Sequence, residues 1–135
     1  MPVADQPEIA AFYEKGLGSD GALQTAIRSA AAAARTEGPY GHYPKGPLNA
    51  EDKAGPIYKI APAERGVLGP KLAAAFEHTH MLVFHPRDSA PPYLQALVDA
   101  GWTTTGIVVI SQLVAFLSYQ IRVVAGLRVL KARPV

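Results

Sequence analysis

The feature that most constrains the fold is a long apolar segment near the C-terminus, residues 104–131. Thr103 belongs to the residue types that cap helix N-termini, and no proline occurs from there to Lys131. The apolar side chains of this predicted helix cover more than one stripe: Ile107, Val108, Ile110, Leu113, Val114, Phe116, Leu117, Ile121 and Val124. A helix that is apolar nearly all round is buried on several sides. We therefore expect a core helix that another subunit also covers.

The same segment contains the most apolar run of the chain, residues 107–121. This run is shorter than the ~20 residues of a spanning helix. It is also interrupted by polar side chains and closed by a cation: Ser111, Gln112, Ser118, Tyr119, Gln120 and Arg122. We interpret it as a core helix and expect no membrane partner. Residues 1–9 include two acids and lack the apolar run of a secretory signal, so a cytoplasmic location is the default expectation.

The rest of the chain predicts further helices separated by glycine and proline. Helical spacing and capping residues indicate helices over about 7–15, 20–34, 70–84 and 91–100. Ser19 or Asp20 is expected to cap the second helix and Ser89 the fourth, and Gly69–Pro70 separates a short turn at 63–68 from the third. No alternating strand pattern of useful length occurs. The prediction is an all-α fold of about five helices in one domain.

Residues 37–61 form a different kind of segment. Glycine and proline are too frequent there for a helix or a central strand, yet tyrosine and aliphatic residues are interleaved, as in Tyr40, Tyr43 and Tyr58. A disordered linker lacks such residues. We expect an ordered extended arm between an N-terminal helical pair (1–36) and a helical core (62–135). It packs on its own domain or on a neighbouring subunit, and we favour the neighbour.

Charge and cysteine content exclude several classes of protein. The net charge is +2, and the chain contains no cysteine. The absence of thiols excludes a disulfide framework, a thiolate metal site and a cysteine nucleophile. Residues 100–135 contain four basic side chains and no acid. Such a basic end is compatible with nucleic acid or anionic lipid, but we favour a solvated helix end, where cations suit the helix dipole, and so expect no nucleic-acid partner.

The stretch from about Leu72 to Leu130 resembles the alkylhydroperoxidase D / carboxymuconolactone decarboxylase family, in particular its uncharacterised peroxidase-related branch. The resemblance is carried by Pro86 after a helix, by Ala100-Gly101-Trp102 at the end of the next, and by Ser118-Tyr119-Gln120-Ile121-Arg122 in a long helix capped by Thr103. It covers under half of the chain. It implies the family's helical fold, an oligomer, and an antioxidant, peroxidase-related or decarboxylase-like activity.

The family's thiol chemistry is not carried over to this chain. In the family, a Cys-x-x-Cys-x-x-x-His helix with a nearby glutamate reduces peroxide. Here the segment where that helix would end, Glu8 to Tyr13, has neither cysteine nor histidine. Whether the chain is an enzyme therefore stays open. If it is, it is a peroxidase-related oxidoreductase or a decarboxylase-like lyase.

A group of polar residues near 80 is the best candidate for chemistry. Glu77 and His80 are three residues apart on one helix face and are our candidate catalytic acid–base pair. Glu77, His78, His80 and His85 also suggest a metal, but His78 and His80 lie roughly 200° apart on a helix, which is poor ligand geometry. We expect no metal and no cofactor. Ordinary surface or interface roles remain the alternative.

Five further residues are candidates for binding. His42 and Tyr43 lie in the arm, where they would line a pocket or dock on a neighbour, and His85 follows the third predicted helix. Trp102 is expected to fill a helix–helix corner. Arg122, if buried, needs a carboxylate or carbonyl partner within an intersubunit network or an anionic ligand.

Two functions from different classes follow. One is a cysteine-free, peroxidase-related oxidoreductase that works without a thiol or receives catalytic residues from a paralogous partner subunit. The other is a non-enzymatic homo-oligomeric assembly protein, or a protein that binds a small-molecule ligand on a degenerate fold. Convergence of Glu77, His80 and His42 on one cavity would favour the first.

Overall fold

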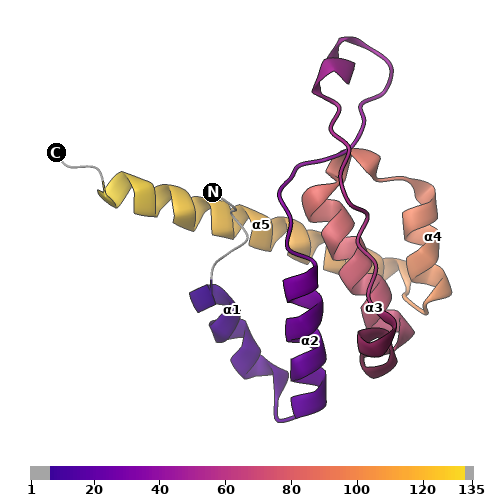
Figure 1. Cartoon of the computed structure of the whole chain (residues 1–135), viewed down its shortest axis with the longest axis vertical. Coiled ribbons are helices and arrows are strands. Elements are labelled where there is room, and N and C mark those ends of the chain that lie inside the picture. The colour runs from indigo at the N-terminus through magenta and orange to yellow at the C-terminus, as the bar shows by residue number, and fades with distance from the viewer. Residues whose placement is uncertain (1–6, 133–135) are drawn as a thin grey trace.

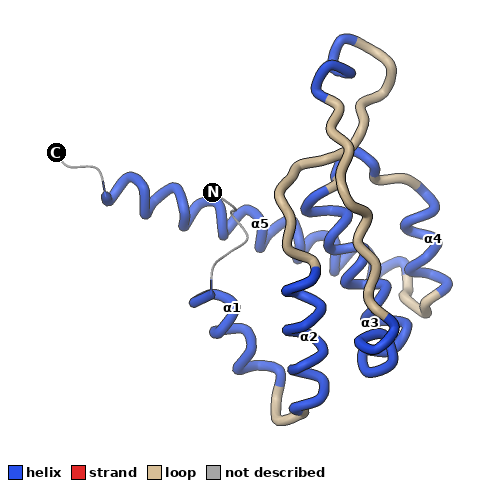
Figure 2. The backbone as a smooth tube through the Cα atoms, viewed as in Figure 1, coloured by secondary structure: helices blue, strands red, loops and turns tan. Residues whose placement is uncertain are grey.

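The structure is a computed structural model, and it describes residues 7–132. Five α-helices account for most of these residues, so the predicted all-α class is confirmed (Figures 1 and 2). They are α1 (Pro7–Glu14), α2 (Gly21–Ala33), α3 (Pro62–Phe84), α4 (Pro91–Asp99) and α5 (Thr104–Ala132). Short 3₁₀ turns cover Lys15–Leu17 (η1), Pro47–Glu51 (η2) and Pro86–Asp88 (η3). Within the described range, the only strand-like pairing is an antiparallel bridge between Gly41 and Lys53.

Helix α3 is the central element. Helices α2 and α4 flank it and α5 crosses it, as Figure 1 shows. Its interior contains Gly69, whose φ of 74° and ψ of 167° kink the helix before Pro70. The sequence predicts this interruption. The structure differs in that the preceding segment, from Pro62, is helical rather than a turn.

The core joins α2, the arm and α3. Its buried residues are small and aliphatic: Ala26, Ala30, Ile60, Leu68 and Ala73. Four partly buried residues pack against them: Leu23, Ile27, Tyr58 and Phe76. The three alanines, from α2 and α3, allow the two helix backbones to approach closely. Burial of apolar surface between α2, the arm and α3 stabilises the fold by about 25 cal/mol per Å² removed from water.

The arm packs at both ends on its own chain. The backbone N–H of Tyr40 donates to the carbonyl of Phe84 at 2.6 Å, and the Tyr58 hydroxyl donates to the carbonyl of Ala30 at 2.8 Å. Gly55 lies so close to the Tyr40 ring that a Cβ there would meet ring atoms at 2.2 Å. Between these ends, residues 41–53 project from the body as a loop (Figure 2). The arm is therefore ordered and fixed to α2 and α3.

Helix caps agree with the sequence at two of three places. Asp20 accepts a hydrogen bond from Leu23 N at 3.0 Å, and the Thr103 hydroxyl accepts one from Gly106 N at 3.1 Å. The prediction for α4 is wrong: Ala90, not Ser89, precedes the helix and no side chain caps it. Two prolines begin α4, and because Pro91 has no N–H the need for a capping acceptor is reduced.

The expected burial of α5 is also not found within the single chain. Ile107 is its only buried residue among those described, and the C-terminal half extends beyond α2, α3 and α4 (Figure 1). Helix α1 lies beside this half, and its Glu8 pairs with Arg128 at 2.8 Å. By length and composition α5 is able to cross a membrane. Its most apolar 18-residue window has a mean hydropathy of 1.8, and 11% of it is buried. The core helices of soluble proteins can have the same length and hydropathy, so these two properties do not identify what covers α5.

Candidate functional site

The strongest cluster of polar side chains centres on Asp88, at the base of the projecting loop. Oδ1 of Asp88 accepts a hydrogen bond from His42 N at 3.0 Å and lies 3.5 Å from His42 Nδ1. Oδ2 lies 3.0 Å from Nδ1 of His85. The η3 turn produces this arrangement, because it brings His85 and Asp88, three residues apart, onto one side. We call His42, His85 and Asp88 the Asp88 cluster.

His85 is the buried member of the Asp88 cluster. Its second nitrogen, Nε2, lies 2.9 Å from the carbonyl oxygen of Pro56, and its ring packs 5.2 Å from that of Tyr40. The histidine therefore ties both strands of the arm to the end of α3. Both ring nitrogens of His85 thus have partners within the chain, and the contact with Oδ2 positions Asp88.

His42 is the exposed member, with 65% of its side chain accessible. Burial of the Asp88 carboxyl would raise its pKa, but hydrogen bonds from His85 and His42 outweigh that effect and lower the pKa. Asp88 is thus a carboxylate at neutral pH. An exposed imidazole beside a carboxylate has the arrangement of a general base.

His80 lies in an aromatic environment beside the Asp88 cluster, with its ring 6.2 Å from that of His85. Its ring packs 5.0 Å from Tyr58 and 4.8 Å from Phe84. Burial, and then the nearby His85, lower the pKa of His80, while the backbone of Ala34 opposes this. His80 is consequently a neutral packing residue between α3 and the arm.

His78 faces the other side of α3, as its spacing from His80 predicts. Its Nε2 lies 3.0 Å from the Ser111 hydroxyl, which itself donates to the carbonyl of Ile107 at 2.8 Å. Because that hydroxyl has one hydrogen, Nε2 must donate to it, and Nδ1 is left as a buried acceptor without a partner. Burial lowers the pKa of His78. This contact fastens α5 to α3.

Glu77 is held by the arm and by the first turns of α3. Its carboxylate accepts hydrogen bonds from Lys59 Nζ at 2.9 Å, from Ile60 N at 3.1 Å and from the Arg65 guanidinium. Within residues 7–132, no hydrogen bond joins Glu77 to His80. The structure therefore does not assemble the expected acid–base pair, and Glu77 makes an ion-pair network that fixes the arm.

The remaining candidate residues lie apart. Tyr43 stacks under the guanidinium of Arg87 at 4.3 Å in the loop. Trp102 donates from Nε1 to the carbonyl of Lys71 at 2.8 Å, which joins the start of α5 to α3 and agrees with a corner-filling role. Arg122 is exposed on α5 rather than buried.

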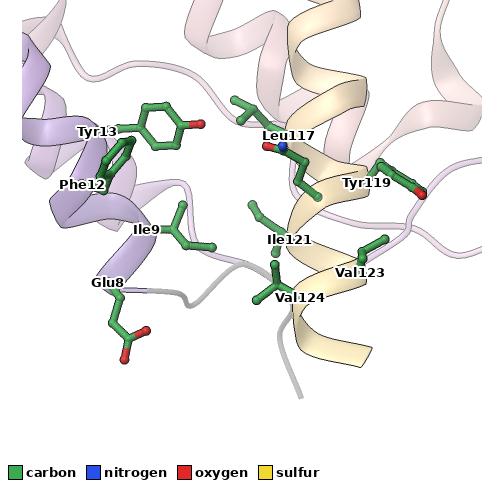
Figure 3. Close-up of a pocket in the computed structure, with 10 residues that line it drawn as sticks. Glu8, Ile9, Phe12, Tyr13, Leu117, Tyr119, Ile121, Val123 and Val124 are labelled. Atoms are coloured by element: carbon green, nitrogen blue, oxygen red, sulfur yellow. The ribbon is translucent and has the colours of Figure 1, made fainter. Parts of the chain in front are cut away.

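An open groove of about 520 Å³ lies between α1 and α5 (Figure 3). Ile9, Phe12 and Tyr13 of α1 face Leu117, Ile121 and Val124 of α5 across it. Its lining is mostly apolar, with Glu8 and Gln120 as the polar exceptions, which suits an apolar ligand or another helix. None of the candidate residues named from the sequence lines this groove in the part of the chain described.

Sequence reasoning missed two features of these sites. Asp88 was not identified, although its place three residues after His85 and two after a proline is a local signal of a turn that brings both together. The groove had no such signal, because it depends on how α1 lies against α5.

Over residues 7–132, no three histidine or acidic side chains are grouped to hold a metal ion.

Comparison of the chain with models of protein families, with curated proteins and with solved structures found no match. The residues and their geometry are therefore the whole basis for a function.

Proposed function

We propose that this chain is the subunit of a non-enzymatic homo-oligomeric assembly, built on an all-α fold similar to that of the alkylhydroperoxidase D / carboxymuconolactone decarboxylase family. The observation that carries the proposal is the exposure of α5. Nine of its large apolar or aromatic side chains are exposed: Val108, Val109, Leu113, Phe116, Tyr119, Val123, Leu127, Val129 and Leu130. Soluble monomers rarely expose a continuous apolar surface of this extent.

A protein cover fits α5 better than a lipid one. Its apolar half contains Ser111, Gln112, Ser118 and Gln120, which a bilayer core would leave without water. Its first turns are also fixed to α3 through the contact between Ser111 and His78. Insertion into a bilayer would require that contact to break, whereas a second copy can cover the exposed side without disturbing it.

The polar residues support a structural role. Glu77 is engaged by two cations and a backbone N–H, and His80 is neutral and packed between rings. With no cysteine in the chain, the thiol mechanism of the similar family is absent.

The proposal is tested by the mass of the full chain in solution, measured by sedimentation equilibrium. We expect an oligomer, and we expect Phe116→Glu to shift the equilibrium towards monomer because a charge would be buried at the contact. Ala115→Glu, which places the same charge on a different face of α5, is the matched control and is expected to associate like the parent. A parent chain that is monomeric, or that floats with phosphatidylcholine–phosphatidylglycerol vesicles, would overturn the proposal.

A second candidate is a peroxidase-related oxidoreductase that works without a thiol. The observation that favours it is the exposed His42 beside the Asp88 carboxylate, a pair able to take up a proton. Turnover of cumene hydroperoxide with dithiothreitol or reduced nicotinamide cofactor, lost in His42→Gln, would support it. No turnover by the folded parent chain with either reductant would count against it.

A further inference from the structure

The outward surface of α5 carries a regular seam of apolar side chains. Its positions follow one another at alternating steps of four and three residues: Val109, Leu113, Phe116, Gln120, Val123, Leu127 and Leu130. This is the 3.5-residue repeat of helices that pack side by side in a coiled coil. The six apolar members are between 38% and 61% exposed. We call these seven residues the α5 seam.

The α5 seam is separate from the face that packs on the chain's own body. That face includes buried Ile107 and Ser111, which contacts His78 of α3. Viewed down a helix of 3.6 residues per turn, the two faces lie more than a quarter turn apart. The groove beside α1 meets the seam only at Gln120 and Val123. The seam therefore has no cover within residues 7–132.

We infer that two copies of this chain pair through the α5 seam with their α5 helices antiparallel and the two-fold axis close to Gln120. The inference rests on the proposed homo-oligomer and names its interface. Gln120 is the only polar residue of the seam and stands at its middle, with three apolar positions on each side. A single polar side chain at such a core position fixes the register and orientation of a helix pair.

The helix dipoles and the position of Lys131 favour the antiparallel direction. Arg122 and Arg128 point away from the α5 seam, and Arg128 pairs with Glu8 of α1 at 2.8 Å, so neither decides the direction. Lys131 follows Leu130 at the edge of the seam, and a parallel pair would bring its two copies to the same end with no acid on α5 to offset them. An antiparallel pair places each Lys131 beside the uncharged first half of the second copy and sets the two helix dipoles in opposition.

The shape of the subunit allows this arrangement. The seam spans about 32 Å along the helix, and its distal half lies on the part of α5 that extends beyond α2, α3 and α4 (Figure 1). Its proximal half stays accessible beside the body, since Val109 and Leu113 are both more than half exposed. The same patch on both copies makes the contact self-complementary, as a two-fold interface requires.

Distances between spin labels on the two copies test the inference, and the cysteine-free chain gives a clean background. Val108→Cys, Tyr119→Cys and Val129→Cys, at exposed positions of α5 outside the seam, are each labelled with a nitroxide in the full chain. For an antiparallel pair centred near Gln120, the helical rise predicts label separations of about 25–40 Å for the two end positions and under about 20 Å for the middle one. Phe116→Glu added to Tyr119→Cys should abolish the short distance, while Ala115→Glu should retain it.

Each outcome is decisive. Short distances at all three positions would mean a parallel pair and overturn the inference. An oligomer by sedimentation with a long distance at Tyr119→Cys would place the interface elsewhere, overturning the seam while leaving the proposed assembly intact. A labelled chain that is monomeric, like its unlabelled parent, would overturn both.

Discussion

His80 is the residue at which burial and protonation are most directly linked. Its ring packs between Tyr58 and Phe84, and its pKa is lowered by burial and by the neighbouring His85. The unfolded chain therefore binds more protons than the folded one once the pH falls below about 6.5, the ordinary pKa of histidine. The stabilisation from neutral His80 is complete above that pH and is lost as the pH falls towards the lowered pKa.

We accordingly expect the free energy of unfolding in urea to decrease between pH 7.5 and 5. His80→Phe keeps an aromatic ring in place and should reduce that slope. His78, whose pKa burial also lowers, should account for part of the remainder. An unchanged slope in His80→Phe would show that other groups cause the pH dependence.

Glu77 joins three parts of the chain through one carboxylate. It is 15% exposed and accepts hydrogen bonds from Lys59, Arg65 and the backbone of Ile60. Hydrogen bonds to charged groups contribute about 1.5–3 kcal/mol each in such settings, and their losses are not additive. Glu77→Ala should therefore lower the free energy of unfolding by about 2–4 kcal/mol in urea.

The exposed Glu37 provides the matched control for this measurement. Glu37→Ala removes the same charge from the surface and should change stability by less than about 0.5 kcal/mol. Equal stability of Glu77→Ala and the parent would contradict the role assigned to the Glu77 network.

Glu77, His78 and His80 show which features of the candidate site the sequence predicts and which it does not. The helical spacing of Glu77 and His80 predicts a shared face, but it cannot show that Lys59 from the arm and Arg65 from an earlier turn engage the carboxylate first. His78 and His80 were predicted to face different ways, and the structure agrees: one contacts Ser111 of α5 and the other Tyr58 of the arm. Helical periodicity predicts the direction in which each side chain points. The residues that each side chain contacts depend on the path of the arm, which periodicity does not predict.

At the scale of elements, the kink in α3 rests on one glycine. Gly69 has φ 74° and ψ 167°, a region that is nearly closed to residues with a Cβ. A Cβ at Gly69 would meet nothing within 4 Å, so the whole cost of Gly69→Ala is conformational. We expect a loss of about 1–3 kcal/mol in unfolding free energy.

Gly66, one turn earlier in the same helix, is the opposite case. It also has open space around it but no unusual φ, so Gly66→Ala should be neutral or add up to about 1 kcal/mol. Thermal unfolding of both variants measures the difference. Equal effects of the two substitutions would contradict a kink that depends on the backbone conformation of Gly69.

Helix ends were readable from the sequence where a side chain or a glycine acts locally. Asp20 and Thr103 make the expected capping hydrogen bonds, and Gly101 ends α4 with a φ of 94°. Ser89 failed as a cap because the prolines of α4 shift the boundary to Ala90. The predicted burial of α5 failed for another reason: an apolar helix indicates that a cover is needed but does not supply it within the chain.

At the scale of the whole molecule, the proposed pairing through α5 would link stability to association. If the folded subunit is stable mainly as a pair, unfolding separates two chains, and mass action makes the midpoint of thermal unfolding depend on protein concentration. A tenfold increase in protein concentration adds about 1.4 kcal/mol to the free energy of unfolding of each pair. For a pair of this size, that corresponds to a rise of about 2–4 °C per tenfold increase.

Differential scanning calorimetry across several concentrations measures this rise. The parent chain and Ala115→Glu should both show it, because Ala115 lies off the α5 seam. Phe116→Glu should unfold at a lower temperature and at the same temperature whatever its concentration, since its apolar seam is interrupted by a charge. A parent chain whose midpoint does not change with concentration would mean that α5 needs no second copy, and the exposed apolar helix would then be a property of the folded monomer itself.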